Sequence, residues 1–422
     1  MRIIHQRCCG LDVHKKSVTA CVLVWDGQTA VEERKKEFGT TKKELERLRF
    51  WLIACKITIV AMESAGVYWK PVWHVLERQK RFKLKLVNAQ HYHGVDGQKT
   101  DQIDSAWLAE LLQCGLLKSS FIPPQWQREL RDLVRLRVSL LEEKNRIQNR
   151  IEKLLEDANL KLGSVASDTL GVSGRRILQA VVAGDKDPGW MADYAKGKLR
   201  SKRKQLEEAL HGFVTEHHRT LLAMLLRQVE SVEADVAFLE TDIRQRLAPH
   251  QDVIERLLEI PGFGEVTAWT VIAELGLDMS VFRTPNRAAS WCGLCPGNRK
   301  SAGKRRHGRT RKGNRWIRRG LTQAALGASN TKDSYLRSFY WRIASKRGAK
   351  KARIATAHKQ LKIAFLIIRD GVRYQDLGSD YFDRRNLDRT KRYLTKRLEG
   401  LGFAVSLTAA PNNGPKADSL SC

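Results

Sequence analysis

Short runs of alternating apolar and polar residues fill the first hundred positions, and this alternation is typical of β-strands. β-Branched residues are frequent in these runs, and a turn near His14 predicts that the first run forms two antiparallel strands. The expected strands cover residues 9–25 as a pair, then 30–38, 56–62 and 82–89. Helical spacing between them predicts helices at 41–55, 67–80 and 101–117, with Thr41 and Thr100 as N-caps. This order predicts an α/β domain over residues 1–122.

Beyond Pro123 and Pro124 the pattern becomes helical, and apolar residues recur at intervals of three, four and seven. They are Leu130, Leu133, Leu136, Leu140, Ile147, Ile151 and Leu154. The spacing predicts a helical, coiled-coil-like arm over 123–250, in which a second helical stretch at 202–247 can pair back on the first. An ordinary amphipathic helix packed on its own domain is the alternative. The predicted fold class is therefore α/β followed by all-α.

Residues 257–275, LLEIPGFGEVTAWTVIAEL, predict two helices joined by a Pro-Gly-Phe-Gly turn, which resembles a helix-hairpin-helix segment. In such a turn Gly262 and Gly264 expose backbone N–H groups near a helix N-terminus, where a phosphate can bind. A turn that serves only packing is the alternative.

The rest of the C-terminal part has weaker signals. Helical spacing predicts helices at 316–330 and 350–370, so that a helical domain is expected over 251–375. Residues 376–422 are expected to form an extension whose end is disordered, because AAPNNGPKADSLSC lacks core residues.

The charge of the chain is strongly one-sided, with 76 Lys and Arg against 46 Asp and Glu and a formal net charge of +30. Eleven of these cations lie between Arg299 and Arg319, and no acid occurs from Met279 to Lys332. Such a block repels itself unless an anion neutralises it, and the phosphate backbone of nucleic acid is the obvious partner. The interleaved Trp316 could stack on a base, whereas a disordered basic tail is the alternative. The candidate phosphate contacts are Lys304, Arg305, Arg306, Arg309, Arg311, Lys312, Arg315, Arg318 and Arg319.

The pattern disfavours membrane and secreted proteins. No apolar run reaches the roughly 18–20 residues of a spanning helix, and the N-terminus has no signal-peptide core. We therefore expect a soluble, cytoplasmic protein. The cysteines are scattered, and Cys292 and Cys295 form a lone C-x-x-C, so reduced thiols are favoured over a zinc site.

Four acidic residues fall where a metal site could form. Asp12 lies in the first strand, Glu63 follows the strand at 56–62, and Asp101 and Asp104 share one face of an expected helix. Hard divalent cations such as Mg²⁺ take carboxylate oxygens that converge from separate elements, and two such ions can drive phosphodiester cleavage. Acids on the first strand, the fourth strand and the last helix suit the ribonuclease H-like fold. Taken singly, each acid has another explanation. Asp12 could be a turn residue, Glu63 could cap the helix that follows it, and Asp101 could be a charge at a helix N-terminus.

Together these segments resemble the IS110 family of bacterial insertion-sequence transposases, the DEDD recombinases. GLDVHK, AMESAGVYW and KTDQIDSAWLAELL are similar to the DEDD positions of the family's RuvC-like domain, which correspond here to Asp12, Glu63, Asp101 and Asp104. IPGFGEVTA and WCGLCPGNRKSAGKRRHGRTRKGNRWIRR are similar to its C-terminal transposase domain. The resemblance covers nearly the whole chain apart from the terminal tail.

The resemblance implies a DNA recombinase that excises and inserts its own element, in a bacterial, nucleoid-associated setting. It implies Mg²⁺ or Mn²⁺ bound by the four acids, and a nucleophilic serine that corresponds to Ser301 in PGNRKSAGK. Ala302 stands where relatives often have glycine. The resemblance further implies a non-coding RNA that guides the protein to DNA by base pairing, and assembly as a homodimer or homotetramer.

Two other functions stay open from the sequence. A metal-only nuclease similar to a Holliday-junction resolvase would use water as the nucleophile and would not need Ser301. A nucleic-acid-binding protein with a dead site would bind with a steep salt dependence and cleave nothing. For Ser301 itself, the alternative is a hydroxyl group that contacts phosphate without chemistry.

Overall fold

The structure is a computed structural model of the 422-residue chain. It describes residues 3–27, 31–64, 66–78, 81–88, 101–185, 187–297, 300–301, 304–305, 310 and 312–408. For 101–104, 300–301 and 304–305 it describes the backbone alone. The chain divides into two compact units, Met1–Pro124 and Gln125–Cys422, and each is considered by itself.

The first unit is built on a five-stranded sheet with strand order β3-β2-β1-β4-β5. The strands are β1 (Arg7–Val13), β2 (Ser17–Val24), β3 (Glu32–Gly39), β4 (Ile59–Glu63) and β5 (Lys83–Val87). β1, β2 and β3 pair antiparallel, whereas β4 pairs in parallel with both β1 and β5. The five predicted strands are confirmed, and the pairing changes from antiparallel to parallel at β1.

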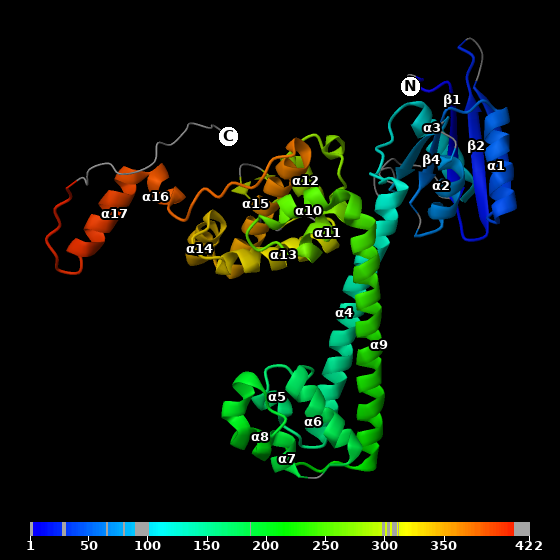
Figure 1. Ribbon diagram of the computed structural model, residues 1–422. Helices are drawn as coiled ribbons and strands as arrows, with labels where there is room; N and C mark the ends of the chain where they lie inside the picture. The colour runs from blue at the N-terminus through cyan, green and yellow to red at the C-terminus, as the bar shows by residue number, and fades with distance from the viewer. Residues whose placement is uncertain are drawn as a thin grey trace. The chain divides into compact units, whose positions relative to one another are not determined.

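Three helices cover the faces of this sheet (Figure 1): α1 (Lys42–Ala54), α2 (Trp69–Glu77) and α3 (Asp101–Gln113). α1 and α2 pack on one face, in a core that joins Leu48 and Leu76 to Leu11 and Met62 of the sheet. α3 packs in a separate core, which joins Leu108 to Ala61.

The predicted caps of these helices have different outcomes. Thr41 caps α1 by accepting a hydrogen bond from the Glu44 backbone N–H at 3.4 Å, which confirms the predicted start of that helix. Thr100, the expected cap of α3, lies outside the described residues.

β3 forms one edge of the sheet, and its sequence EERKKEFG is mostly charged. Residues 32–37 are exposed, and their charges pair along the strand, Arg34 with Glu32 at 2.6 Å and Lys35 with Glu33 at 2.8 Å. Phe38 is buried and joins the core beneath α1 and α2. β3 thus pairs with β2 along its whole length and joins the core through Phe38 near its C-terminal end, while residues 32–37 stay polar.

The second unit contains two long helices, α4 (Gln125–Asp157) and α9 (Glu216–Leu247), which we call the arm. They lie side by side (Figure 1). Ion pairs show that they run antiparallel, since residues later in α4 pair with residues earlier in α9. These pairs are Glu129–Arg246, Arg137–Glu240 and Lys144–Glu233. The second long helix therefore does pair back on the first.

Between the two long helices the chain forms a small helical cluster, which we call the tip. Its helices are α5 (Leu162–Val165), α6 (Val172–Ala183), α7 (Pro188–Ala192), η2 (Gly197–Lys202) and α8 (Arg203–Ala209). A shared core joins Ile177 of α6 to Ile151 of α4 and Leu222 of α9. α9 begins later than the predicted position 202, because Phe213 N–H donates to the Ala158 carbonyl at 2.8 Å and Thr215 then caps the helix.

Where the structure describes it, the C-terminal part of this unit is helical apart from one short hairpin. Its elements are η3 (Ala248–His250), α10 (Gln251–Leu258), α11 (Glu265–Leu275), η4 (Met279–Val281), α12 (Pro285–Trp291), β6 (Lys300–Ser301), β7 (Lys304–Arg305), α13 (Arg315–Asn330), α14 (Tyr335–Arg347), α15 (Ala349–Asp370), α16 (Tyr381–Arg385) and α17 (Leu387–Glu399). α15 lies at the centre, packed against α10, α12, α13 and α14 with Leu361 and Phe365 buried.

The structure confirms the predicted order of a mixed α/β part followed by a mostly helical remainder. The predicted helices at 316–330 and 350–370 are α13 and α15, whereas α14 had no counterpart among the predicted helices. The expected disorder at the end of the chain concerns residues 409–422, which lie outside the described residues. Within the described ranges, no helix combines the length and the apolar character that crossing a membrane requires.

Candidate active site and nucleic-acid interface

Asp12 and Glu63 lie at the ends of two neighbouring parallel strands. β1 and β4 pair through Leu11 and Met62, and Asp12 and Glu63 are the next residues along their strands. Because side chains alternate along a strand, both acids belong to the sheet face opposite Leu11 and Met62. Ala61, on that same face of β4, packs against α3. The strand register therefore brings two predicted site residues together on the α3 side of the sheet.

α3 crosses β1 in the opposite direction, so its first turn lies toward Asp12. Ile4 N–H donates to the Gln113 carbonyl at 2.9 Å, near the end of α3. Further along the chain, within β1, the Cys8 thiol donates to the Ala109 carbonyl at 3.6 Å. Residues later in β1 therefore contact residues earlier in α3. The backbone of Asp101–Asp104 accordingly reaches the end of the sheet where the two strand acids lie.

Gly10 allows α3 to come this close. A Cβ atom on Gly10 would overlap the backbone of Ser105 and Ala109, so any larger residue would push the helix away from β1. The side chains of Asp101 and Asp104 are outside the described part of the structure. Their convergence with the two strand acids stays a prediction, and it is supported by the path of the α3 backbone.

His14 is a site residue that the sequence pattern did not indicate. Its Nε2 atom lies 2.9 Å from Oδ2 of Asp12, while the Asp12 side chain is 10% exposed and that of His14 is 51% exposed. The contact fixes one oxygen of a nearly buried carboxylate. A histidine two positions after an acid, at the end of a strand, was the available signal, but a turn residue explains it equally well.

The donor set fits a hard divalent cation. A nearly buried aspartate beside a partly exposed glutamate offers oxygen ligands from two strands, as Mg²⁺ and Mn²⁺ require. Among the side chains that the structure describes, no group of three His, Cys, Asp or Glu residues forms a metal site. Because the side chains of Asp101 and Asp104 are not among them, the described pair is half of the expected ligand set.

The basic block, from Arg299 to Arg319, contains a short hairpin in the part that the structure describes. β6 and β7 pair antiparallel, with Ser301 opposite Lys304 and Lys300 opposite Arg305. Pro296 and Thr310 form a bridge outside this hairpin. The predicted contacts Arg306, Arg309 and Arg311 lie outside the described residues. The two hairpin strands of the block are thus paired with each other through their backbones, and Thr310 is tied to Pro296 just before the block.

Beyond the hairpin, the remaining predicted cations lie at the start of α13. Lys312 and Arg315 are exposed, and Arg318 is half-buried. Arg319 forms an ion pair with Glu142 of α4, so the protein itself partly neutralises that charge. The ring of Trp316 contacts two guanidinium groups, Arg315 at 4.5 Å and Arg135 at 5.7 Å. A base that stacked on Trp316 would have to share the ring with them.

The two predicted glycines of the α10–α11 turn have different surroundings. Gly262 has a φ of +82°, and a Cβ atom there would overlap the backbone of Ala324 and Ala328 in α13. Gly264 is exposed at the N-cap of α11, with open space where a Cβ would be. Gly262 therefore has a packing role that explains its identity, and Gly264 is the better placed of the two for a phosphate.

Glu274 of α11 is an acid buried among cations, and its side chain is 0% exposed. Arg135 donates to both carboxylate oxygens, Nε to Oε1 at 2.7 Å and Nη2 to Oε2 at 2.8 Å. Arg131 lies 3.4 Å from Oε2, and Asn314 Nδ2 donates to Oε2 at 2.5 Å. Burial lowers the pKa of Arg131 to about 10, which the charge of Glu274 opposes.

Asn314 links this buried network to the basic block. Its Oδ1 caps α13 by accepting from Trp316 N–H at 3.0 Å and Ile317 N–H at 3.3 Å. Its own backbone N–H donates to the Trp291 carbonyl at 3.3 Å. Glu274 thus holds the residue at which the block joins α13, and the long-range partners that do this are invisible in the local sequence.

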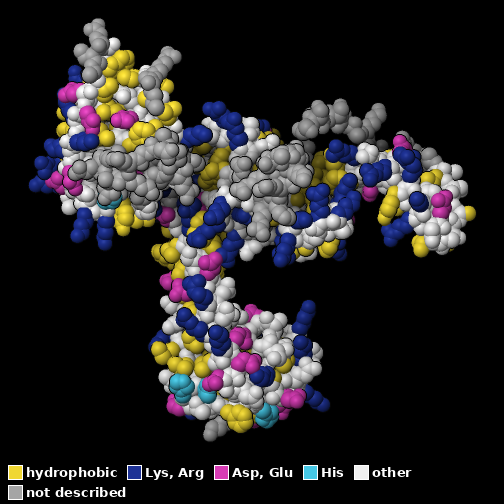
Figure 2. All heavy atoms as spheres, turned by 180° about the vertical axis from the view of Figure 1, so that it is seen from behind, with side chains coloured by type: hydrophobic (Ala, Val, Ile, Leu, Met, Phe, Trp, Pro, Cys, Tyr) yellow, Lys and Arg dark blue, Asp and Glu magenta, His cyan; other side chains and the backbone are white. Residues whose placement is uncertain are grey.

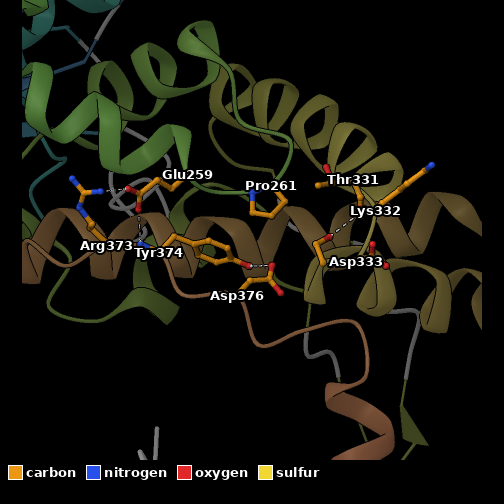
Figure 3. A pocket seen from close by; sticks show the side chains of 9 residues that line it. Glu259, Pro261, Thr331, Lys332, Asp333, Arg373, Tyr374 and Asp376 are labelled. Atoms are coloured by element: carbon orange, nitrogen blue, oxygen red, sulfur yellow. Dashed lines mark hydrogen bonds and ion pairs between the residues drawn. The ribbon is translucent and has the colours of Figure 1, made fainter. Parts of the chain in front are cut away.

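An open groove of about 630 Å³ lies beside the α10–α11 turn (Figure 3). Its lining residues are Glu259, Pro261, Thr331, Lys332, Asp333, Ser334, Arg373, Tyr374 and Asp376. Glu259 accepts from Arg373 at 3.1 Å and from Tyr374 N–H at 3.0 Å, and the Tyr374 hydroxyl donates to Asp376 at 2.9 Å. Burial raises the pKa of Tyr374, and the bond to Asp376 adds to the effect. These bonds fasten the segment after α15 to the turn.

Comparison with known proteins places both regions in one family. Residues 9–159 match a family model of IS110-type DEDD transposases, described as a transposase, and residues 254–341 match the transposase IS116/IS110/IS902 family. A curated relative, the insertion element IS900 uncharacterized 42 kDa protein of Mycobacterium paratuberculosis, is 30% identical over 159 residues. That match covers 37% of this chain and 39% of the relative, so it spans about two fifths of the relative's length. The first match includes Asp12, Glu63 and α3, and the second includes the basic block. The chain belongs to the IS110 family of insertion-sequence transposases.

Proposed function

We propose that this protein is a DNA transposase that excises and inserts its own insertion sequence. The observation that carries the proposal is the register of the first unit, which sets Asp12 beside Glu63 at the ends of β1 and β4. α3 runs back over these strands, so its first turn approaches the same end of the sheet. An acid on the central strand, one on its parallel neighbour and a pair on a covering helix suit a ribonuclease H-like nuclease site.

Asp12, Glu63, Asp101 and Asp104 are the residues that would hold Mg²⁺ or Mn²⁺. When bound, the metal would polarise the scissile phosphate and stabilise the negative charge that develops on its oxygens. The contact of His14 with Oδ2 fixes the orientation of the Asp12 carboxylate. The low exposure of Asp12 keeps bulk water from competing for it.

Ser301 is the proposed nucleophile. Its hydroxyl oxygen would lose a proton and form a bond to the phosphorus, and the bond from phosphorus to one sugar oxygen would break as that oxygen takes up a proton. The resulting phosphoserine link would conserve the free energy of the broken phosphodiester bond. During rejoining, a free sugar hydroxyl of another strand would attack the phosphorus, and the serine hydroxyl would be released. In the backbone of the hairpin Ser301 lies opposite Lys304, and Lys300 directly precedes it in the chain, so the proposed nucleophile belongs to a basic segment.

The partners of this reaction follow from the family and the charge. DNA at the element's ends and at the target would supply the scissile phosphates, and a non-coding guide RNA would select them by base pairing. Lys312, Arg315 and Arg318 would neutralise backbone phosphates near the start of α13. We also infer a homodimer or homotetramer, since excision and insertion must hold several strand ends at once.

Trapping a covalent adduct tests the proposal. Protein, element-junction DNA, the flanking transcript and Mg²⁺ are incubated together, and a denaturing gel separates protein–DNA adducts. We expect an adduct with the wild type that is lost in both Ser301→Ala and Asp12→Ala. Ser290→Ala is the matched control, because Ser290 is exposed on the neighbouring helix α12 and should leave the adduct unchanged.

The other outcomes of this gel identify the rival functions. Cleavage without an adduct that survives Ser301→Ala would establish a metal-only nuclease with water as the nucleophile. Binding without an adduct or cleavage, in the presence of the transcript, would leave a nucleic-acid-binding protein with a dead site.

A further inference from the structure

A second basic surface lies at the turn between α14 and α15, which follows the basic block in the sequence. From Ser334 to Arg369 there is no Asp or Glu. Gly348, with a φ of +82°, turns the chain between the two helices. We call the cations around this turn the basic corner: Lys346, Arg347, Lys350, Lys351 and Arg353. All five are exposed.

The described acids of the protein do not neutralise the basic corner. Over residues 312–408, which are all described, the ion pairs are formed by Arg319, Arg369, Arg373 and Arg384. None of the five corner cations takes part in these described pairs. Lys350 and Arg353 lie three positions apart on α15, so they share a face and repel each other, which costs stability unless an anion approaches.

The corner is presented on a packed helix rather than on a loose segment. Directly behind its cations, α15 buries Ala352, Thr356 and Ala357. Trp341, on α14, is 54% exposed and its Nε1 donates to the Ser329 carbonyl at 3.2 Å, which fixes the ring against α13. Figure 2 shows that Lys and Arg side chains recur over the C-terminal part of the second unit.

We propose that the basic corner binds the sugar-phosphate backbone of duplex DNA, as a contact separate from the basic block. All five of its members follow residue 341, where the match to the transposase family model ends. Flexible lysines and arginines exposed around a turn between two helices suit phosphates, which need charge but no pocket. This inference rests on the proposed function for its choice of DNA.

The test compares two variants that lose the same charge. The corner variant is Lys346→Gln/Arg347→Gln/Lys350→Gln/Lys351→Gln in the full chain. The control variant is Lys196→Gln/Lys198→Gln/Arg200→Gln/Lys204→Gln, which removes four exposed cations from the tip. Each protein is titrated against a fluorescent duplex DNA over a series of NaCl concentrations without divalent metal, and circular dichroism verifies that both are folded.

We expect the slope of log affinity against log salt to fall by about 0.9 for each phosphate that the variant no longer neutralises. The corner variant should therefore show a slope smaller by roughly 2–4, and the control variant a slope close to the wild type. Equal slopes for the two variants would overturn the proposal. A slope that changes with duplex RNA of the same length but not with DNA would also overturn it.

Binding measured without cleavage separates failure of the corner from failure of the proposed function. An adduct that forms normally in a corner variant whose salt slope is unchanged would reject the corner and keep the transposase. A reduced slope in a protein that forms no adduct would keep the corner as a DNA contact and reject the serine chemistry.

Discussion

The arm and the helices α13 to α15 are both rich in Lys and Arg, yet they use these residues in opposite ways. In the arm, cations of one helix meet acids of the other, as in Arg137–Glu240 at 2.6 Å and Lys144–Glu233 at 2.7 Å. Around the α14–α15 turn, the cations form no such pairs with the acids that the structure describes. The positive charge that is available for a partner is therefore the part that the fold leaves unmatched.

Glu274 marks the boundary between these two uses. It belongs to the C-terminal helices, but its partners Arg131 and Arg135 come from α4, and it is fully buried. The protein therefore uses an acid of this region to join the arm to α11 and α13. That acid does not reduce the charge of the exposed surface.

The largest expected effect is that of Glu274→Gln. The substitution leaves two buried or half-buried arginines facing a neutral amide, so we expect a loss of about 3–5 kcal/mol in the free energy of unfolding. Glu240→Gln in the arm removes a more exposed partner of Arg137 and should cost about 1 kcal/mol or less. Urea denaturation followed by tryptophan fluorescence measures both, and equal losses would remove the distinction between the two regions.

Substitution of the turn glycines comes next. Gly262→Ala places a methyl group against α13 at a positive φ, so we expect a loss of about 2–4 kcal/mol. Gly264→Ala meets open space at an extended φ and should cost less than about 1 kcal/mol. Thermal unfolding and DNA affinity are measured for both variants. If Gly264→Ala weakens DNA binding at unchanged stability, the exposed turn contacts phosphate; unchanged binding would assign the turn to packing.

Acid should weaken the arm through Glu233. Burial alone raises the pKa of Glu233, but hydrogen bonds from Lys144 and Arg175 outweigh it and leave the pKa below its usual value of 4.5. A carboxyl group with a lowered pKa contributes stability above pH 4.5, and that contribution is lost as the pH falls through the lowered pKa. The protection factors of α9 in hydrogen exchange, which correct for the slower intrinsic exchange in acid, should therefore fall in the wild type as the pH drops below 4.5. Glu233→Gln should show faster exchange at neutral pH and a flatter response to acid.

The smallest effect expected is an opposite response to salt. Raising NaCl from low to high concentration screens the paired charges of the arm and should speed its hydrogen exchange slightly. The same salt screens repulsion within the basic corner, so exchange near Gly348 should slow slightly. Responses of the same sign in the two regions would mean that the corner cations are neutralised within the protein.

Most of the sheet could be predicted from the sequence, because its strands alternate or form short apolar runs between clear turns. The same holds for α13 and α15, whose helical spacing survives among the charges. α14 escaped prediction because YLRSFYWRIASKR carries aromatic and basic residues on several faces. The tip escaped because residues 202–209 read as the start of the next long helix, whereas a backbone bond from Phe213 to Ala158 closes the cluster first.

The candidate site divides in the same way. Asp12 and Glu63 could be predicted to meet, because parallel strand ends share one edge of a sheet. Recognition of His14 as a site residue required the direction of its side chain. Recognition of Glu274 required its partners Arg135 and Asn314, which lie 139 and 40 positions away in the sequence. No local pattern reports contacts of that kind. The packing role of Gly262 likewise required the position of α13.

The charged edge strand β3 bears on how copies of this protein can assemble. A neighbouring strand that docked there would have to desolvate the charged residues from Glu32 to Glu37, and their mixed signs would tolerate few registers. The sheet of the first unit is therefore closed to growth on the β3 side, and this also protects the chain from forming fibrils through that edge. A dimer or tetramer that extended this sheet would have to use its other edge, β5, and any other contact between copies would lie on other surfaces, such as the helices.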